Sequence, residues 1–397
     1  VIIFLGKFST QFLSFFLLPL YTSYLNKADY GTVDLILTYI TLLVPVVTLQ
    51  LENGTFRYLI DARGNDKKIA NVLKNSSNLL FVFSLIFSVL YACVTLFFKF
   101  EYYYIVVFSI LLTMWANYFL QVTRGLGKNS IYSIASFVTG IVNFASNIIF
   151  IIVLKKGAQS ILYSSIIANL VCSIFLIFDL KIWKLFKSGS KDKSLKRELI
   201  KYSWPLVPNS ICWWLINASD RTIVSVVMGV GMNGIYAIST KFSTIISSML
   251  TIFGLSWTES ASIHINDEDR DVFFTDINTT IMRLFSSLCI GLIAFMPFIF
   301  SIFINRQYQD AYLYVPINIL ATFFNCLISV YSAIYIAKKM TKKVALTSAG
   351  AAFINIVVDF SLIKYIGLFA ASISTVVAYM IMAIYRSFDL KKYVKIK

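Results

Sequence analysis

The sequence has little of what soluble enzymes use for chemistry. Its 397 residues include one histidine, five cysteines and only 19 acidic residues against 35 basic ones. His264 has no second histidine with which to build a metal site, and the cysteines lie in apolar stretches without a CxxC spacing. The sequence shows no Walker loop, no dinucleotide-binding glycine pattern and no nucleophile elbow. We therefore expect no metal, no cofactor and no energy supplied by bound ATP.

Charge is also scarce. Charged residues make up 14% of the chain and hydrophobic residues 58%, and the mean hydropathy is +0.77. A water-soluble domain could not carry this composition without exposing much of its hydrocarbon. Runs of about 20 apolar residues, the length that crosses a bilayer as a helix, predict an all-α, polytopic integral membrane protein with twelve transmembrane helices. The twelve expected spans cover residues 2–24, 32–56, 76–98, 103–123, 131–154, 159–179, 203–228, 234–257, 281–303, 311–337, 344–363 and 367–386.

The basic residues predict the orientation of these spans. Most Lys and Arg lie in every second connection and in the C-terminal tail, and the alternate connections hold far fewer. Basic residues accumulate on the cytoplasmic side, so both termini are expected in the cytoplasm. The formal charge of +16 is then mainly a topology effect with some attraction to anionic lipid, and we expect no nucleic-acid partner.

Internal repetition predicts two related halves. The hairpin at residues 19–59 has a counterpart two hundred residues later, and the polar pairs Asn143/Asn147 and Asn355/Asp359 occupy spans five and eleven, six spans apart. We expect a six-helix lobe over residues 1–180, a basic cytoplasmic linker over 181–201, a second six-helix lobe over 202–397 and a substrate path in a central cleft. A chance match of short apolar motifs, and a regulatory role for the linker, are the alternatives.

Four stretches carry a family resemblance: FLLPLYTSYLNKADYGTVDLILTY, LENGTFRYL, NASDRTIVS and MNGIYAISTKFS. Together they resemble the bacterial polysaccharide flippases of the Wzx or O-antigen translocase type, within the multidrug, oligosaccharidyl-lipid and polysaccharide exporter superfamily. The resemblance implies a transporter of the bacterial inner (cytoplasmic) membrane, not an enzyme. It would move undecaprenyl-diphosphate-linked oligosaccharide to the outer leaflet for O-antigen, lipopolysaccharide or capsule synthesis by alternating access. It also implies membrane lipid, a polysaccharide polymerase and a chain-length regulator as partners.

Polar side chains inside the spans are the candidate site residues, since a charge at the centre of a membrane helix costs about 2.5 to 3.5 kcal/mol. Cations and amides facing the cleft would bind the diphosphate or the sugar by charge-assisted hydrogen bonds. These candidates are Lys7, Gln11, Arg57, Asn217, Arg221 and Lys241. The candidates for coupling to H⁺ or Na⁺ are Glu52, Asp220 and Asp359.

Alternatives remain open for residues and function. Lys7 and Arg57 could extend to the interface instead, and Glu52 and Asp359 could be structural hydrogen-bonding groups. An ion-coupled multidrug-type antiporter of the same superfamily should have an acidic lumen, whereas this one leans basic. A membrane-embedded polymerase should have a large outer loop, and the outward connections are short. A lipid scramblase without ion coupling is a further alternative function.

Overall fold

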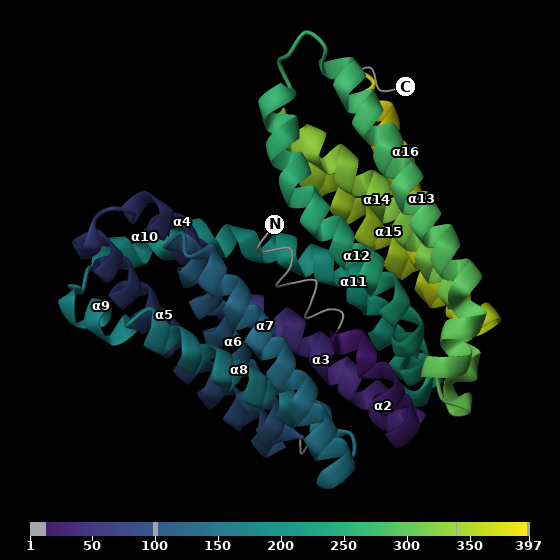
Figure 1. Ribbon diagram of the computed structural model, residues 1–397, viewed down its shortest axis with the longest axis horizontal. Helices are drawn as coiled ribbons and strands as arrows, with labels where there is room; N and C mark the ends of the chain where they lie inside the picture. The colour runs from purple at the N-terminus through teal and green to yellow at the C-terminus, as the bar shows by residue number, and fades with distance from the viewer. Residues whose placement is uncertain (1–12, 98–101, 339, 395–397) are drawn as a thin grey trace. The chain divides into compact units, whose positions relative to one another are not determined.

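The computed structural model describes residues 13–97, 102–338 and 340–394, and every regular element among them is a helix (Figure 1). The α-helices are α2 Leu18–Tyr24, α3 Lys27–Val47, α4 Leu51–Ala62, α5 Asp66–Phe97, α6 Tyr103–Gly125, α7 Asn129–Ile148, α8 Gln159–Asp179, α9 Ile182–Ser188, α10 Lys193–Ser203, α11 Val207–Met228, α12 Val230–His264, α13 Arg270–Phe303, α14 Val315–Ala337, α15 Thr341–Ile366 and α16 Phe369–Leu390. Three other helical segments are η1 Ile149–Val153, η2 Trp204–Leu206 and η3 Arg306–Leu313.

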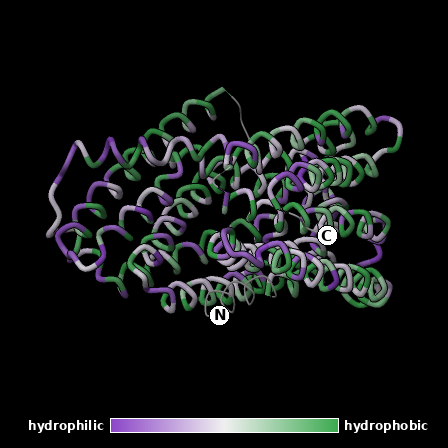
Figure 2. The backbone as a smooth tube through the Cα atoms, turned by 90° about the horizontal axis from the view of Figure 1, so that it is seen from above, coloured by the Kyte–Doolittle hydropathy of each residue, from purple (hydrophilic) through white to green (hydrophobic). Residues whose placement is uncertain are grey.

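Ten of the predicted spans correspond to helices long and apolar enough to cross a membrane among the described residues. Figure 2 shows hydrophobic stretches along the helices and hydrophilic residues at several of the turns. The predicted span 2–24 begins in residues outside the described part of the chain. The predicted span 203–228 corresponds to α11, which is less apolar because it carries Asp220 and Arg221. The all-helical membrane architecture is therefore confirmed.

The second predicted span, 32–56, is not one continuous helix. It divides into α3 and α4 at Leu49 and Gln50, whose φ angles of 51° and 58° are left-handed. The Gln50 amide donates to the carbonyl of Pro45, and its side-chain Nε2 donates to Ser210 Oγ at 2.5 Å. A non-glycine residue in this conformation costs about 1 to 3 kcal/mol, and such breaks inside membranes are tolerated where protein surrounds them.

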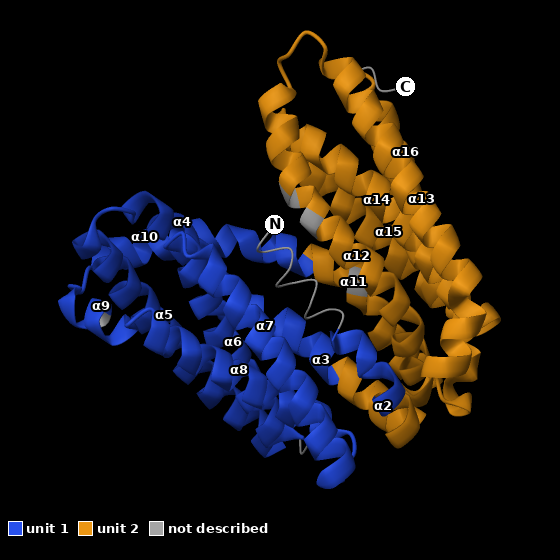
Figure 3. Ribbon diagram, in the orientation of Figure 1, with its two compact units in different colours: residues 1–20, 36–211 blue, residues 21–35, 212–397 orange. Residues whose placement is uncertain are grey.

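The chain forms two compact units, which Figure 3 colours separately. Unit 1 comprises residues 1–20 and 36–211, and unit 2 comprises residues 21–35 and 212–397. This division differs from the predicted lobes, because residues 21–35 pack with the C-terminal half of the chain.

The predicted linker is folded onto unit 1. Residues 181–201 hold α9 and most of α10. Asn75 on α5 fixes the turn between them: its Nδ2 donates to Ser190 O at 2.9 Å, and its Oδ1 accepts the Asp192 amide at 2.9 Å. Lys74 Nζ adds a bond to Gly189 O at 2.7 Å. These contacts make the segment part of a compact unit.

Within unit 2, the start of α3 packs against the start of α12, its counterpart in the sequence repeat. A Cβ added to Gly31 would lie 1.9 Å from Val230 O, and one added to Gly234 would lie 2.1 Å from Lys27 O. Asn233 Nδ2 donates to Gly31 O at 2.8 Å across this crossing. Glycine at both positions allows α3 and α12 to approach backbone to backbone, as small residues do between membrane helices.

The α2–α3 turn is bound to η3 of the same unit. Gln307 Nε2 donates to Thr22 O at 2.7 Å and to Leu25 O at 2.9 Å. The buried Tyr308 hydroxyl also donates to Leu25 O, at 3.0 Å. Because these bonds satisfy carbonyls at the end of α2, they explain why residues 21–35 belong to unit 2.

Candidate functional site

The predicted substrate-binding residues have different fates. Lys7 and Gln11 lie outside the described residues, and Asn217 lies on α11 with its side chain not described. Arg57 is exposed and pairs with Asp61 at 2.7 Å, one turn further along α4. An exposed pair of this kind contributes little to stability. Arg221 and Lys241 are the two predicted cations whose surroundings within unit 2 can be described.

Arg221 and Lys241 share one acidic neighbour, Asp34 on α3. Arg221 Nη1 lies 3.4 Å from Asp34 Oδ2, and the Asp34 side chain is 5% exposed. Arg221 also donates to Thr240 Oγ1 at 3.4 Å. Lys241 is half-buried and lies close enough to Asp34 and Arg221 to interact with both charges. Counted by themselves, Arg221, Lys241 and Asp34 carry a net positive charge, which suits a bound anion, and Asp220 also lies close enough to interact with the charge of Arg221.

Asp220, the neighbour of Arg221 in sequence, takes different partners. Its Oδ2 accepts the Tyr236 hydroxyl at 2.9 Å and the Thr375 hydroxyl at 2.8 Å. Its Oδ1 has no hydrogen-bond partner among the described residues. Neighbouring residues on a helix point in different directions, so the two take different partners: Asp220 bonds to α12 and α16, and Arg221 bonds to α12 and α3.

Asn355 on α15 extends this network. Its Oδ1 accepts the Ser219 hydroxyl at 3.1 Å, and its Nδ2 donates to Ser374 Oγ and Thr375 Oγ1, both at 3.2 Å. Asn355 is fully buried. The network therefore joins α11, α12, α15 and α16 through neutral side chains around one carboxylate.

Asp359 lies one turn beyond Asn355 on α15 and is 0% exposed. Neither of its carboxylate oxygens has a hydrogen-bond partner among the described residues. It is close enough to Asp220 for the two charges to repel each other. Burying a charge without a partner is costly. The second carboxylate is therefore stable here only when a cation binds beside it or a proton neutralises it.

Asp220 and Asp359 offer oxygen ligands of the kind that a small cation takes, and their surroundings differ from a transition-metal centre. No group of three His, Cys, Asp or Glu side chains suited to a metal ion occurs in the described part of the chain. Asp220 and Asp359 instead offer three oxygens without partners, beside the Asn355 amide and the Thr375 hydroxyl. Oxygen ligands of this kind suit hard cations, and a proton would serve the same electrostatic purpose.

Glu52, the third predicted coupling residue, lies in unit 1 at the start of α4, just after the left-handed break. It is 8% exposed, bonds to the Thr48 side chain and leaves Oε2 without a partner among the described residues. Nearby, the Asn53 amide donates to Gln50 Oε1, and Gln121 Nε2 donates to Asn53 Oδ1 at 3.3 Å. Glu52 is thus a buried acid beside a chain of amides.

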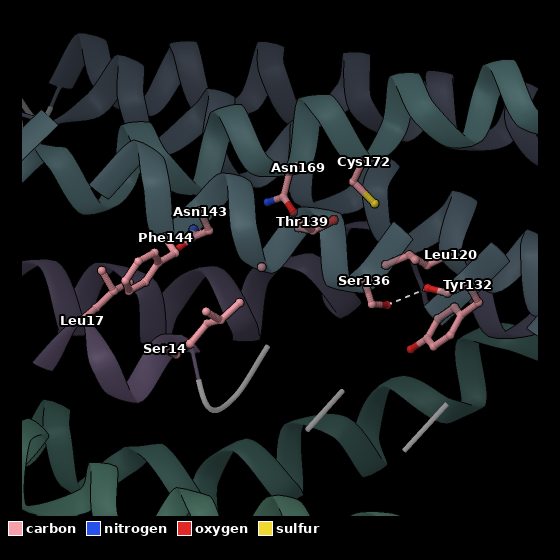
Figure 4. Close-up of a pocket in the computed structure, with 12 residues that line it drawn as sticks. Ser14, Leu17, Leu120, Tyr132, Ser136, Thr139, Asn143, Phe144, Asn169 and Cys172 are labelled. Carbon is pink, nitrogen blue, oxygen red and sulfur yellow. Dashed lines mark hydrogen bonds between the residues drawn. The ribbon is translucent and has the colours of Figure 1, made fainter. Parts of the chain in front are cut away.

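Unit 1 also contains a pocket of about 340 Å³ that the sequence interpretation missed (Figure 4). Its polar lining is uncharged: Ser14, Tyr132, Ser136, Thr139, Asn143 and Asn169. Ser136 Oγ donates to Tyr132 O at 2.9 Å, and Asn169 Nδ2 donates to Thr113 Oγ1 at 3.0 Å. The spacing of the four polar residues on α7, at positions i, i+4, i+7 and i+11, could have revealed this face.

The comparisons identify the family. The sequence model of the family described as "Polysaccharide biosynthesis protein" matches residues 1–258, well over half of the chain. The chain belongs to this family. No curated protein matches it by sequence.

Solved structures show the fold. An inward-facing multidrug resistance MATE family transporter of the MOP superfamily is similar with a TM-score of 0.80 and 13% identity, covering 96% of this chain and 95% of that one. An outward-facing transporter of the same description has a TM-score of 0.71 and 13% identity, and the match covers 98% of this chain and 93% of that one. A MATE crystallised in complex with MaL6 has a TM-score of 0.68 and 13% identity, and the match covers 99% of this chain and 95% of that one. This family member therefore has the fold of MOP-superfamily transporters.

Proposed function

We propose that this polysaccharide biosynthesis protein is a flippase for undecaprenyl-diphosphate-linked oligosaccharide. It would carry repeat units from the cytoplasmic to the outer leaflet of the bacterial inner membrane, for O-antigen or capsule synthesis. The family match supports a role in polysaccharide synthesis, and the fold supports transport. Both termini would be cytoplasmic, and a polymerase and a chain-length regulator would act on the delivered units.

The observation that carries this proposal is the net positive cluster of Arg221, Lys241 and Asp34 in unit 2. A diphosphate presents several oxygens to an ammonium and a guanidinium, and such charge-assisted bonds are roughly twice as strong as neutral ones. A cationic drug would meet repulsion at the same place. Lys7, Gln11, Arg57 and Asn217 remain proposed contributors, without structural support from the described residues.

The uncharged pocket of unit 1 suits the sugar part of this substrate. Hydroxyls and amides such as Ser136, Thr139 and Asn143 both donate and accept hydrogen bonds, and the Tyr132 ring supplies a flat apolar face. At about 340 Å³ the pocket is small, so we assign it part of the oligosaccharide.

Coupling to H⁺ or Na⁺ would occur at the buried acids. Asp220 and Asp359 form the first candidate site, and Glu52 in unit 1 forms the second. Binding a cation at Asp220 and Asp359 removes the repulsion between them, which gives an ion gradient a means of changing the energy of unit 2.

Flipping in proteoliposomes tests the function. A fluorescent undecaprenyl-diphosphate oligosaccharide is inserted in one leaflet, and its arrival in the other is followed with a membrane-impermeant quencher. We expect Lys241→Arg to keep part of the rate, Lys241→Ala to lose most of it and Lys241→Glu to abolish it, at equal protein abundance. An unchanged rate for Lys241→Glu would refute the cationic site.

The second candidate is a multidrug-type antiporter, which the similarity to multidrug resistance MATE structures favours. The same vesicles distinguish the two functions. Ion-driven efflux of a lipophilic cation, with no flipping of the lipid-linked sugar, would establish the antiporter instead.

A further inference from the structure

Unit 2 has a groove of about 280 Å³ between α15 and α16. Its lining includes Gly350, Ala351, Leu346 and Ile354 from α15 and Tyr385 from α16. Leu346 is 62% exposed and Tyr385 is 54% exposed, so the groove opens outward from the helix pair. It follows α15 from Leu346 to Ile354, eight steps along the helix or about 12 Å at 1.5 Å per residue.

The groove is open at Gly350. A Cβ placed on this glycine would meet no atom within 4 Å. The lining is otherwise almost entirely apolar, with Thr347 as its main polar side chain. The Thr347 hydroxyl is already bound, because it donates to Lys343 O at 2.8 Å and accepts from the Arg386 guanidinium. The groove therefore suits a hydrocarbon chain.

The helix ends beside the groove are basic. Lys342 and Lys343 begin α15, and Lys391 and Lys392 follow the end of α16. Asp389 near the end of α16 joins these two helix ends, because it pairs with Lys343 of α15 at 2.7 Å and with Lys392 at 3.5 Å.

Four lysines against one aspartate leave an excess of positive charge at these helix ends. Lys342 and Lys391 are both exposed, and Lys391 Nζ lies 5.2 Å from the Phe388 ring centroid. Basic pockets between membrane helices on the cytoplasmic side bind anionic lipid headgroups.

We propose that this groove binds one acyl chain of an anionic phospholipid, with the headgroup phosphate held by Lys342 and Lys391. The apolar lining at Gly350 and the basic helix ends match the two parts of such a lipid in the order in which they lie along α15. A groove of about 12 Å takes part of one acyl chain and is short for the long polyprenyl tail of the proposed substrate. The site is distinct from the transport proposal, since none of the proposed substrate-binding or coupling residues lines the groove.

Electron spin resonance of spin-labelled lipids tests the site. The full-length protein is reconstituted in phosphatidylcholine with a trace of spin-labelled phosphatidylglycerol or phosphatidylcholine, and the immobilised fraction is measured. We expect phosphatidylglycerol to be selected over phosphatidylcholine. Lys342→Gln and Lys391→Gln should each reduce this selectivity about fivefold, which corresponds to about 1 kcal/mol per lysine. Gly350→Phe should fill the groove and abolish the selectivity.

Matched controls separate the site from general effects. Gly291→Phe on α13 adds the same ring at another glycine whose Cβ would meet nothing within 4 Å. Lys364→Gln removes a charge from the opposite end of α15. Both should keep the parent's selectivity, and thermal unfolding reports whether each variant is folded. Equal immobilisation of the two lipids, or an unchanged result in folded Gly350→Phe, would overturn the proposal. Displacement of the labelled lipid by undecaprenyl phosphate would also overturn it, by assigning the groove to the substrate tail.

Discussion

Replacing Asp359 should make unit 2 more stable and insensitive to the coupling ion. The parent buries both carboxylate oxygens without a partner among the described residues, near the charge of Asp220. Each unsatisfied buried group costs about 1 to 3 kcal/mol, and more when it is charged. Asp359→Leu has a similar size and no polar atom, so we expect the ion-free variant to gain at least about 2 kcal/mol.

The same reasoning fixes the response to ions. A cation at 100 times its dissociation constant stabilises the folded parent by about 2.7 kcal/mol. For a unit of about 200 residues, this corresponds to a rise in Tm of about 5 to 10 °C. Asp359→Leu lacks one of the two carboxylates, so it should lose the part of the Tm response that comes from the Asp220–Asp359 pair. The ion should therefore stabilise the parent more than Asp359→Leu, by an amount equal to the binding free energy at this site.

Thermal unfolding of purified protein measures both effects. Na⁺ is titrated against choline at constant ionic strength, and protons are titrated separately, which identifies the ion. Glu259→Gln is the control, because Glu259 is an exposed acid on α12 of the same unit and should respond like the parent. Parallel ion responses in the parent and in Asp359→Leu, or a variant less stable than the ion-free parent, would refute the assignment of Asp359.

Two further predictions concern packing. Gly31→Ala or Gly234→Ala should lower the free energy of unfolding by at least about 1 to 3 kcal/mol, because each added Cβ would overlap a backbone carbonyl; thermal unfolding measures this, with Gly291→Ala as the control whose Cβ has open space. Asn75→Leu should release the α9–α10 turn, because it removes the bonds to Ser190 and Asp192. Trypsin should then cut this turn several times faster than in the parent, and an unchanged cleavage rate would show that Asn75 does not hold it.

Hydropathy predicted the helices well because each membrane helix needs its own apolar run, and this property belongs to one segment. The cost of burying charge likewise singled out Asp220 and Asp359 from the sequence alone. The features that the sequence analysis missed depend on contacts between segments far apart in the chain. Asp34 was not chosen, because its role comes from Arg221, which lies 187 positions later.

The break at Leu49 and Gln50 was also missed, for a different physical reason. The apolar run continues through it, and Gln50 is held by Ser210, which lies 160 positions away. Neither residue is a glycine, so the usual marker of a left-handed backbone is missing. Pro45 was the available indication, because proline removes one helical hydrogen bond and weakens the turn around it.

Three helices pass from one unit to the other, and one of the proposed coupling residues, Asp220, lies on one of them. α2 enters unit 2 at Tyr21, α3 returns to unit 1 at Ile36, and α11 enters unit 2 at Cys212. Any rearrangement of one unit against the other therefore has to be absorbed at or near these residues, since the chain is continuous there. Asp220 lies about two turns beyond Cys212, and its neighbour Arg221 binds Asp34, which is two residues before Ile36. A change of charge at Asp220 thus acts beside two of these crossing segments, which is the physical requirement for an ion to drive the alternating access that we propose.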